Sequence, residues 1–377
     1  MIPFNKPYLT GKETLYINQA VNSGKISGNG MFTKKCHQFF QEKYEVKKVL
    51  LTTSCTDALE MAAMLIDVQP GDEIIVPSYT FVSSALAFTR MGAKIVFIDS
   101  LPHHPNMDVS LLEGLINKKT KAIVPVHYGG VACEMDIIMN LARKYNLFVI
   151  EDAAQAIEAK YKGKQLGTIG HMGCFSFHET KNIQCGEGGA LFVNDDRFTQ
   201  RAEIIWEKGT NRASFFRGEI NKYGWVDTGS SFLPADILAA FLWAQLENIE
   251  DIQKKRLALW ERYLSNLSKF DQNLFDLPVS LLHTTNNAHV FYIKCKDLET
   301  RDLLIRRLKE KDIFPVFHYL SLHKSEFMDS NSNLIDLPNA DHFTDCLLRL
   351  PLFVDLGLDE VDNICDNIKD LCLSSPL

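Results

Sequence analysis

Between residues 48 and 151, short apolar segments alternate with segments of helical period. The apolar segments predict strands at residues 48–52, 73–76, 94–99, 122–126 and 147–151. The intervening segments predict helices at residues 56–66, 82–90, 109–117 and 133–145. Short apolar strands that are each followed by a helix predict an α/β fold with a mostly parallel sheet covered by helices on both faces. Ligands bind such sheets at the carboxyl ends of the strands.

The rest of the chain predicts flanking helices and a second, smaller domain. Helices are expected at residues 11–21 and 32–43, with the loop SGKISGNG between them, and a strand at 190–193 precedes a helix at 197–207. Residues 209–231 have no clear period and form a connector long enough to suggest a functional or partner-contacting loop. A long helix at 236–267 leads to strands at 290–294 and 313–319 and helices at 301–311 and 359–371. We therefore expect a large domain at residues 1–245 and a small C-terminal α+β domain at 246–377.

Composition excludes several classes of function. The formal net charge of −7 argues against nucleic-acid binding, which needs a basic face. The nine cysteines are odd in number and form no CxxC pair, and the histidines show no metal-ligand spacing, so we expect reduced thiols, a cytoplasmic location and no metal. The sequence shows no secretory signal, and no apolar stretch approaches the ~20 residues of a membrane span.

One lysine stands in an unusual setting. Residues 173–189 read GCFSFHETKNIQCGEGG, in which an apolar run at 174–177 predicts a buried strand. Lys181 follows this strand and precedes Gly186, Gly188 and Gly189. Burial would lower the pKa of its amine, as a lysine that forms a Schiff base requires. The alternative is a solvated loop lysine, which is the commoner case for any single lysine.

Three further strand ends carry candidate site residues. Thr56 stands where a strand gives way to a helix, and the free N–H groups of that helix start could bind an anion, or Thr56 could be an ordinary cap. Asp152 ends an apolar strand and could pair with a protonated pyridine nitrogen, or cap a helix. Phe81 could stack on a flat ring, or pack in the core.

Taken in chain order, these residues describe one cofactor. An anion-binding helix start, an aromatic side chain, a strand-end aspartate and a lysine are the parts that hold the phosphate, ring, pyridine nitrogen and aldehyde of pyridoxal phosphate. The order of the four in a βα sheet therefore predicts a pyridoxal-phosphate site around Lys181.

The motifs SCTDALEMAA, GDEIIVPSYTFVSSA, EDAAQA, LGTIGHMGCFSFHETKN and GEGGA resemble those of the DegT/DnrJ/EryC1/StrS sugar-nucleotide aminotransferases. The resemblance runs from Ile2 to Leu352 and implies the fold-type-I architecture of pyridoxal-phosphate aminotransferases and a homodimer with shared active sites. By motif position it makes Lys181 the Schiff-base lysine. It implies that Asp152 contacts the pyridine nitrogen and that Phe81 stacks on the ring. It implies that Thr56, Asp57 and Ser176 hold the phosphate and that Gln155 lies near the ring hydroxyl. Substrate contacts are implied for His318, Tyr319 and His323. Ser231 stands where many members carry an asparagine that reaches the partner's cofactor phosphate.

The stretches VPVHYGGVACEMD, FSFHETKN and EKGTNR are similar to the subgroup that makes dTDP-4-amino-4,6-dideoxygalactose for surface polysaccharide such as O-antigen. This implies transfer of an amino group from L-glutamate, which leaves as 2-oxoglutarate, to C4 of dTDP-4-keto-6-deoxyglucose, with pyridoxamine phosphate as the intermediate cofactor form. We expect Arg212, Arg217 or Lys222 to bind the pyrophosphate of the dTDP-linked sugar. The gluco product and transfer to C3 remain alternatives. Lys181 argues against the related 3-dehydratases, which carry histidine there, and Lys181 with Asp152 argues against a non-catalytic regulator.

Overall fold

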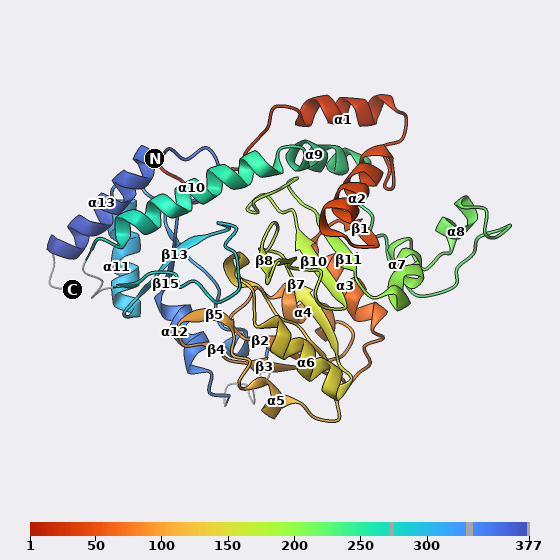
Figure 1. The fold of residues 1–377 in the computed structure, drawn as a ribbon, viewed down its shortest axis with the longest axis horizontal. Helices are drawn as coiled ribbons and strands as arrows, with labels where there is room; N and C mark the ends of the chain where they lie inside the picture. The colour runs from red at the N-terminus through yellow and green to blue at the C-terminus, as the bar shows by residue number, and fades with distance from the viewer. Residues whose placement is uncertain (271–274, 329–334, 375–377) are drawn as a thin grey trace.

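The computed structural model describes residues 1–270, 275–328 and 335–374. Its centre is a seven-stranded sheet in the order β1-β11-β10-β7-β6-β2-β3 (Figure 1). The strands are β1 (Lys48–Thr52), β2 (Glu73–Pro77), β3 (Lys94–Ile98), β6 (Thr120–Ile123), β7 (Phe148–Asp152), β10 (Met172–Ser176) and β11 (Gly189–Val193). Neighbouring strands are parallel except that β11 runs antiparallel to both β1 and β10. The predicted α/β fold with a mostly parallel sheet is confirmed.

Helices cover both faces of this sheet because its strands are apolar on both sides. On one face Val49 and Leu51 pack with α2 (Met31–Tyr44), α6 (Met135–Tyr145) and α9 (Asp236–Leu246). On the other face Leu50 packs with α3 (Cys55–Leu65), α4 (Ser83–Thr89) and α7 (Thr199–Trp206). Successive residues of one strand thus enter opposite cores, as the period-2 geometry of a strand requires.

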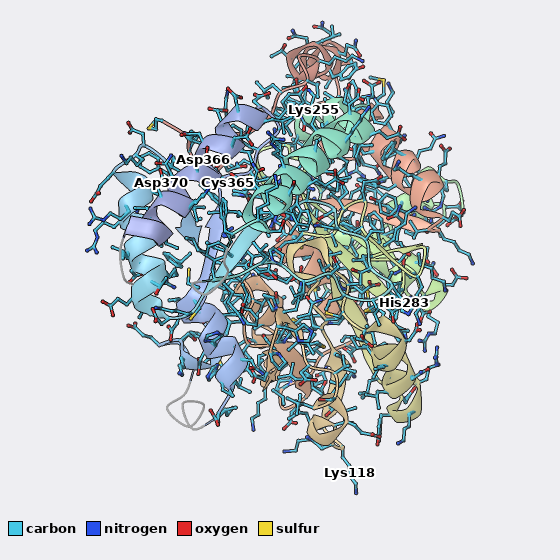
Figure 2. All side chains as sticks on the ribbon, turned by 60° about the vertical axis from the view of Figure 1, so that its left-hand side comes forward. Lys118, Lys255, His283, Cys365, Asp366 and Asp370 are labelled. Atoms are coloured by element: carbon cyan, nitrogen blue, oxygen red, sulfur yellow. The ribbon has the colours of Figure 1, made fainter. Side chains whose placement is uncertain are left out.

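A second sheet lies in the C-terminal part of the chain. It is antiparallel in the order β12-β13-β15-β14, with β12 (Phe275–Asp276), β13 (Phe291–Cys295), β14 (Val316–Phe317) and β15 (Leu347–Leu350). Its helices are α10 (Ile249–Leu267), α11 (Leu298–Lys309), α12 (Pro338–Cys346) and α13 (Leu358–Ser374). Figure 2 shows α10 and α13 side by side. Cys365 of α13 is buried in the apolar core that this sheet forms with its helices, whereas Asp366 and Asp370 are exposed.

Several predicted elements differ from the observed ones. The helix expected at 109–117 is reduced to α5 (Leu112–Leu115), and the strand expected at 313–319 to β14. The long helix expected at 236–267 is interrupted between α9 and α10, where Asn248 leaves the helical region of backbone angles. No element was expected where α12 and β15 form. The other predicted strands and helices are present within two or three residues of the expected ends.

The aperiodic connector is mostly irregular. It holds one short helix, α8 (Arg212–Phe216), and with its flanking loops it projects from the body of the molecule (Figure 1). Phe216 and Trp225 on this projection are 68% and 83% exposed. At the N-terminus, α1 (Glu13–Asn22) packs along α9.

Candidate active site

A cavity of about 820 Å³ opens at the carboxyl ends of the central strands, and residues of both sheets line it. It collects eight of the side chains that the sequence singled out: Thr56, Phe81, Asp152, Gln155, Ser176, Lys181, His318 and Tyr319. They meet because parallel strands place all their carboxyl ends on one edge of the sheet. The cavity is therefore the candidate active site.

Four predicted site residues lie elsewhere. Asp57 does not line the cavity; its carboxylate accepts from the Thr53 hydroxyl. His323 is fully buried, with Nδ1 2.7 Å from the Ser78 hydroxyl, and it too is absent from the cavity wall. Arg212 lies on α8 over the ring of Phe216, and Ser231 is exposed in a bridge to Glu207. Within the chain, therefore, Arg212 and Ser231 lie outside the cavity.

Lys181 is held by a tight loop that follows β10. The Phe177 N–H donates to the Gly188 carbonyl at 2.8 Å, and the Lys181 N–H donates to the His178 carbonyl at 2.9 Å. The sequence assigned no role to His178; its Nδ1 lies 2.9 Å from the Thr180 hydroxyl and accepts from the Thr180 N–H at 3.2 Å. His178 therefore shapes the turn from which the Lys181 side chain enters the cavity.

The electrostatic environment favours the neutral amine of Lys181. Burial lowers the pKa of this amine, and the cation of Arg349 lowers it further. The carboxylate of Asp152 acts in the opposite direction, but burial is the largest effect. An amine with a lowered pKa can act as a nucleophile or base near neutral pH.

Asp152 is buried at the end of β7, and donors hold both of its oxygens. The Ser84 hydroxyl donates to Oδ2 at 2.6 Å, and the Ala154 N–H donates to Oδ1 at 3.1 Å. Ser84 is itself 2.9 Å from the hydroxyl of Thr80. These contacts fix the carboxylate at the cavity wall, where it can stabilise a cationic ring nitrogen.

The start of α3 offers donors to an anion. Ser54 caps the helix by accepting from the Asp57 N–H at 3.0 Å, so the cap expected at Thr56 is at Ser54 instead. The N–H groups of Cys55 and Thr56 have no acceptor within the helix, and both residues line the cavity. A Cβ on Gly189 would lie 2.4 Å from the Ser54 carbonyl carbon, so glycine is what lets β11 approach this helix start. Free N–H groups, the hydroxyl of Thr56 and the nearby hydroxyl of Ser176 suit a phosphate.

A chain of polar contacts joins the central sheet to the second one. Gln155 accepts from the Gly129 N–H at 2.7 Å and donates to the Tyr319 hydroxyl at 2.8 Å. His318 stacks on Tyr319 with ring centroids 3.6 Å apart, and its Nδ1 lies 2.6 Å from the Tyr128 hydroxyl. Burial raises the pKa of Tyr319 and lowers that of His318 well below its ordinary value, so both side chains are uncharged.

His289 and Arg349 line the cavity but were not among the predicted site residues. His289 lies in the wall and donates Nδ1–H to Asn182 Oδ1 at 2.9 Å, because the Asn182 amide nitrogen already donates to Gln253 and to the Asn287 carbonyl. Arg349 comes from β15. An arginine inside the apolar run LLRLPLF was the one available signal for it.

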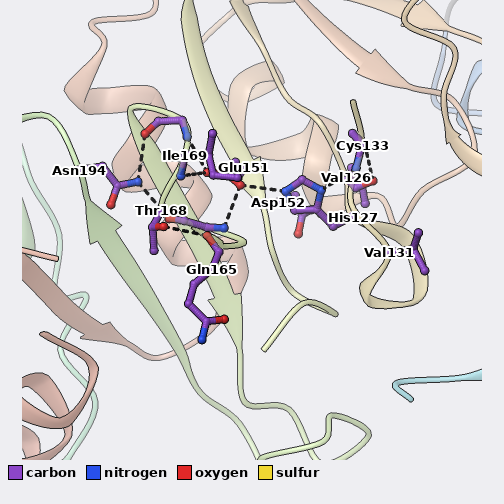
Figure 3. Close-up of polar contacts among 12 residues, drawn as sticks. Val126, His127, Val131, Cys133, Glu151, Asp152, Gln165, Thr168, Ile169 and Asn194 are labelled. Atoms are coloured by element: carbon purple, nitrogen blue, oxygen red, sulfur yellow. Dashed lines mark hydrogen bonds and ion pairs between the residues drawn. The ribbon is translucent and has the colours of Figure 1, made fainter. Parts of the chain in front are cut away.

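Glu151 precedes Asp152 and anchors the opposite side of the same strand end (Figure 3). It is fully buried, and its carboxylate accepts four hydrogen bonds. The N–H groups of Ile169 and Gly170 donate to Oε1 at 2.7 and 2.6 Å; the Gly167 N–H and His127 Nε2 donate to Oε2 at 2.8 and 2.9 Å. The three backbone bonds hold the segment that leads into β10, and hence the strand that precedes Lys181, while the fourth ties His127 to the same carboxylate.

The sequence profile of the DegT/DnrJ/EryC1/StrS aminotransferase family matches residues 7–369. The chain belongs to this family. GDP-perosamine synthase of Escherichia coli O157:H7 is 32% identical over 375 residues, which cover 98% of each chain. The family assignment confirms an aminotransferase with pyridoxal phosphate as its cofactor.

Solved structures agree with the family assignment. A putative sugar aminotransferase, Spr1654 of Streptococcus pneumoniae in its PMP form, superposes with a TM-score of 0.90 at 26% identity and covers 99% of this chain and 100% of its own. DesV of S. venezuelae, solved in complex with a ketimine intermediate, superposes with a TM-score of 0.88 at 28% identity and 98% coverage of each chain. These structures support the predicted fold-type-I architecture.

Within residues 1–270, 275–328 and 335–374, no three His, Cys, Asp or Glu side chains are grouped as metal ligands. In the same ranges, no helix combines the length and the apolarity needed to cross a membrane.

Proposed function

We propose that this aminotransferase moves the amino group of L-glutamate to C4 of dTDP-4-keto-6-deoxyglucose, giving the dTDP-linked 4-amino-4,6-dideoxygalactose for surface polysaccharide such as O-antigen. The observation that carries the aminotransferase reaction is the shared cavity of Lys181 and Asp152. The sugar and its nucleotide rest on the resemblance of VPVHYGGVACEMD, FSFHETKN and EKGTNR to the enzymes that make this product.

The cofactor fits the polar groups that surround the cavity. We assign its phosphate to the start of α3, with the hydroxyls of Thr56 and Ser176, and its ring nitrogen to Asp152. Phe81, which is 57% exposed beside the cavity, would cover one face of the ring, and Gln155 would lie near the ring hydroxyl. When bound, pyridoxal phosphate supplies an aldehyde that takes up amines and a ring that accepts electron density.

Lys181 moves the protons in this proposal. Its lowered pKa leaves an amine that can remove the proton from Cα of glutamate, and its loop places it beside Asp152 in the same cavity. In the second half of the reaction the same side chain returns a proton to C4 of the sugar. The face of C4 that receives this proton determines whether the galacto or the gluco product forms.

The projection around α8 supports a homodimer. Its exposed Phe216 and Trp225 are unusual for a surface that faces only water. We propose that a second copy covers them, and that Arg212, Arg217, Lys222 and Ser231 serve the partner's cavity, since they do not line their own. We further propose a cytoplasmic location, which agrees with the eight buried free cysteines that the structure describes.

The test is incubation with L-glutamate and either dTDP-4-keto-6-deoxyglucose or its GDP-linked counterpart, followed by NMR of the product. The GDP arm is included because a 32% identical relative is named GDP-perosamine synthase. We expect turnover of the dTDP sugar, nitrogen on C4 and the small H3–H4 coupling of an axial amine. A large coupling would indicate the gluco product, nitrogen on C3 would overturn the regiochemistry, and preference for the GDP sugar would overturn the nucleotide.

A further inference from the structure

His289 presents one ring nitrogen to the cavity. It lies just before β13, is 7% exposed and lines the cavity that also holds Lys181. Its Nδ1 is 2.9 Å from Oδ1 of Asn182, which is the residue that follows Lys181 in the chain. This bond ties the imidazole ring to the loop of the catalytic lysine.

The hydrogen bonds of Asn182 determine which ring nitrogen of His289 carries a proton. The Asn182 amide nitrogen lies 2.8 Å from the Asn287 carbonyl, which can only accept. The oxygen of this amide must therefore be the atom that faces His289, so Nδ1 carries the proton that it donates. Burial lowers the pKa of His289 well below its ordinary value, and nearby cations, Lys181 among them, lower it further. The ring is therefore neutral, and Nε2 carries a lone pair and no proton.

The backbone of His289 is held as firmly as its ring. The buried Arg256 donates from Nη2 to the His289 carbonyl at 2.8 Å and from Nε to the Ala288 carbonyl at 3.0 Å. The Asn287 side chain accepts from the His289 N–H at 3.1 Å and donates to the Gln155 carbonyl at 2.7 Å. Nε2 has no hydrogen-bond partner among the described residues and is not sealed from solvent, so its lone pair opens into the cavity. An acceptor that is already fixed binds a donor with little further loss of conformational freedom.

The two substrates that enter the cavity offer different partners to this acceptor. Glutamate has two carboxylates, which cannot donate, and an amino group that is transferred in the reaction. The keto sugar carries hydroxyls, which donate readily to a lone pair. The carbons next to C4 are C3, which bears a hydroxyl, and C5, which bears the methyl branch and the ring oxygen. Because Lys181 acts at C4 and His289 is tied to the residue after Lys181, the hydroxyl that best suits Nε2 is the one on C3.

We propose that Nε2 of His289 accepts a hydrogen bond from the C3 hydroxyl of the keto sugar and so helps to select this sugar and to hold its C4 beside Lys181. This inference rests on the proposed function for the identity of the sugar and for C4 as the reacting carbon. A sugar without the C3 hydroxyl would leave a buried acceptor unpaired, which costs affinity. His289 is thus a specificity-determining residue for the sugar half of the reaction.

Two substitutions separate the bond to the sugar from the bond to Asn182. His289→Asn places an amide nitrogen at the position of Nδ1, so it keeps the bond to Asn182 and lacks an acceptor at the position of Nε2. His289→Gln places its amide at the position of Nε2, so it keeps an acceptor there and loses the bond to Asn182. His103→Asn is the matched control, because His103 is exposed and lies outside the cavity.

Each protein is assayed with the dTDP-linked keto sugar, with its 3-deoxy and 2-deoxy forms, and in the half-reaction with glutamate alone. Calorimetric binding of dTDP-6-deoxyglucose gives a readout without turnover, because this analogue has a hydroxyl in place of the C4 ketone and cannot accept an amino group. The thermal midpoint of each protein reports its stability.

We expect His289→Asn to lower kcat/KM for the keto sugar, and to weaken binding of the analogue, by about tenfold each, as the loss of one hydrogen bond predicts. The wild type should lose a similar factor with the 3-deoxy sugar, whereas His289→Asn should lose nothing more with it, because the bond is already absent. With the 2-deoxy sugar the difference between the two proteins should persist. The glutamate half-reaction of His289→Asn should change by less than about twofold. His289→Gln should keep most of the activity on the sugar and have the lower thermal midpoint, since it loses the bond to Asn182.

Three results would overturn the proposal. The first is a wild-type kcat/KM for the keto sugar in His289→Asn. The second is an equal loss in both half-reactions, which would indicate a structural role. The third is a loss with the 3-deoxy sugar that is as large in His289→Asn as in the wild type, which would show that His289 does not contact that hydroxyl.

Failure of the proposed function would appear in the wild type, before any variant is compared. In that case the wild type would not turn over the dTDP sugar. The same comparison with the GDP-linked sugar, which carries the same C3 hydroxyl, would then decide the role of His289.

Discussion

Replacing Glu151 with glutamine should destabilise the protein strongly although it removes no atoms of the side-chain skeleton. The glutamate accepts from four donors, two at each oxygen, in a fully buried site (Figure 3). Glutamine keeps one acceptor oxygen and directs an NH₂ group at the other two donors. His127 cannot compensate by moving its proton, because Nδ1 accepts from the Cys133 N–H at 3.2 Å and the proton must stay on Nε2.

The magnitude follows from those two lost acceptors. Each buried donor left without an acceptor costs about 1–3 kcal/mol, so Glu151→Gln should lower the free energy of unfolding by about 2–6 kcal/mol. That is a large part of the 5–15 kcal/mol that is typical of folded proteins. The effect is structural, since the carboxylate of Glu151 does not line the cavity.

The assay is urea unfolding of cofactor-free protein, followed in parallel by tryptophan fluorescence and far-ultraviolet circular dichroism. Coincident transitions and an unchanged slope would show that the midpoint shift reports stability. Glu113→Gln is the control, because its carboxylate is half-exposed, bonded to Lys144 and Tyr145 at the surface, and should leave the midpoint unchanged. A loss below about 1 kcal/mol in Glu151→Gln would refute the argument that four fixed donors need this carboxylate.

Three further predictions concern the cavity and the projection. The fold lowers the pKa of Lys181 below its ordinary 10.5, so the unfolded chain binds the proton more readily and this residue destabilises the fold below that pH. Cofactor-free Lys181→Met should therefore have a higher thermal midpoint than the wild type at pH 7. The difference between the two midpoints should shrink as the pH rises toward 10.5. Asp152→Asn should slow the glutamate half-reaction by at least about 100-fold while the fold persists, as stopped-flow absorbance would show. Alanine at Arg212, Arg217 and Lys222 together should raise the KM for the nucleotide sugar and leave the KM for glutamate unchanged. If the variant kept the wild-type KM for the nucleotide sugar, the projection would have no part in sugar binding.

The local pattern of the sequence predicted the layers of the fold and four of the residues that line the candidate active site. Short apolar strands alternate with helices, and this alternation places strand ends near Thr56, Phe81, Asp152 and Lys181. The structure brings all four side chains to one cavity. It leaves Asp57 and His323 outside, because nearness to a motif along the chain does not determine the direction of a side chain.

What the sequence did not reveal is which distant segments come into contact. Gln155 meets Tyr319, 164 positions away, and Arg349 enters the cavity from a strand of the second sheet. Local periodicity carries no signal for such pairs, since their meeting is decided by how one sheet packs beside another. The antiparallel direction of β11 is a further example, because strand pairing and not propensity sets it.

The sequence by itself therefore determined the α/β class, the family and a lysine–aspartate pair at neighbouring strand ends. The class and the pair follow from residue spacing along the chain, which parallel connections convert into nearness at one edge of the sheet, and the family follows from its motifs. Only the tertiary structure decided the surroundings of those residues: burial lowers the pKa of Lys181, Ser84 fixes Asp152, and Arg349 of the second sheet lines the same cavity. Burial and long-range packing are properties of the folded chain, so no local stretch of sequence encodes them alone.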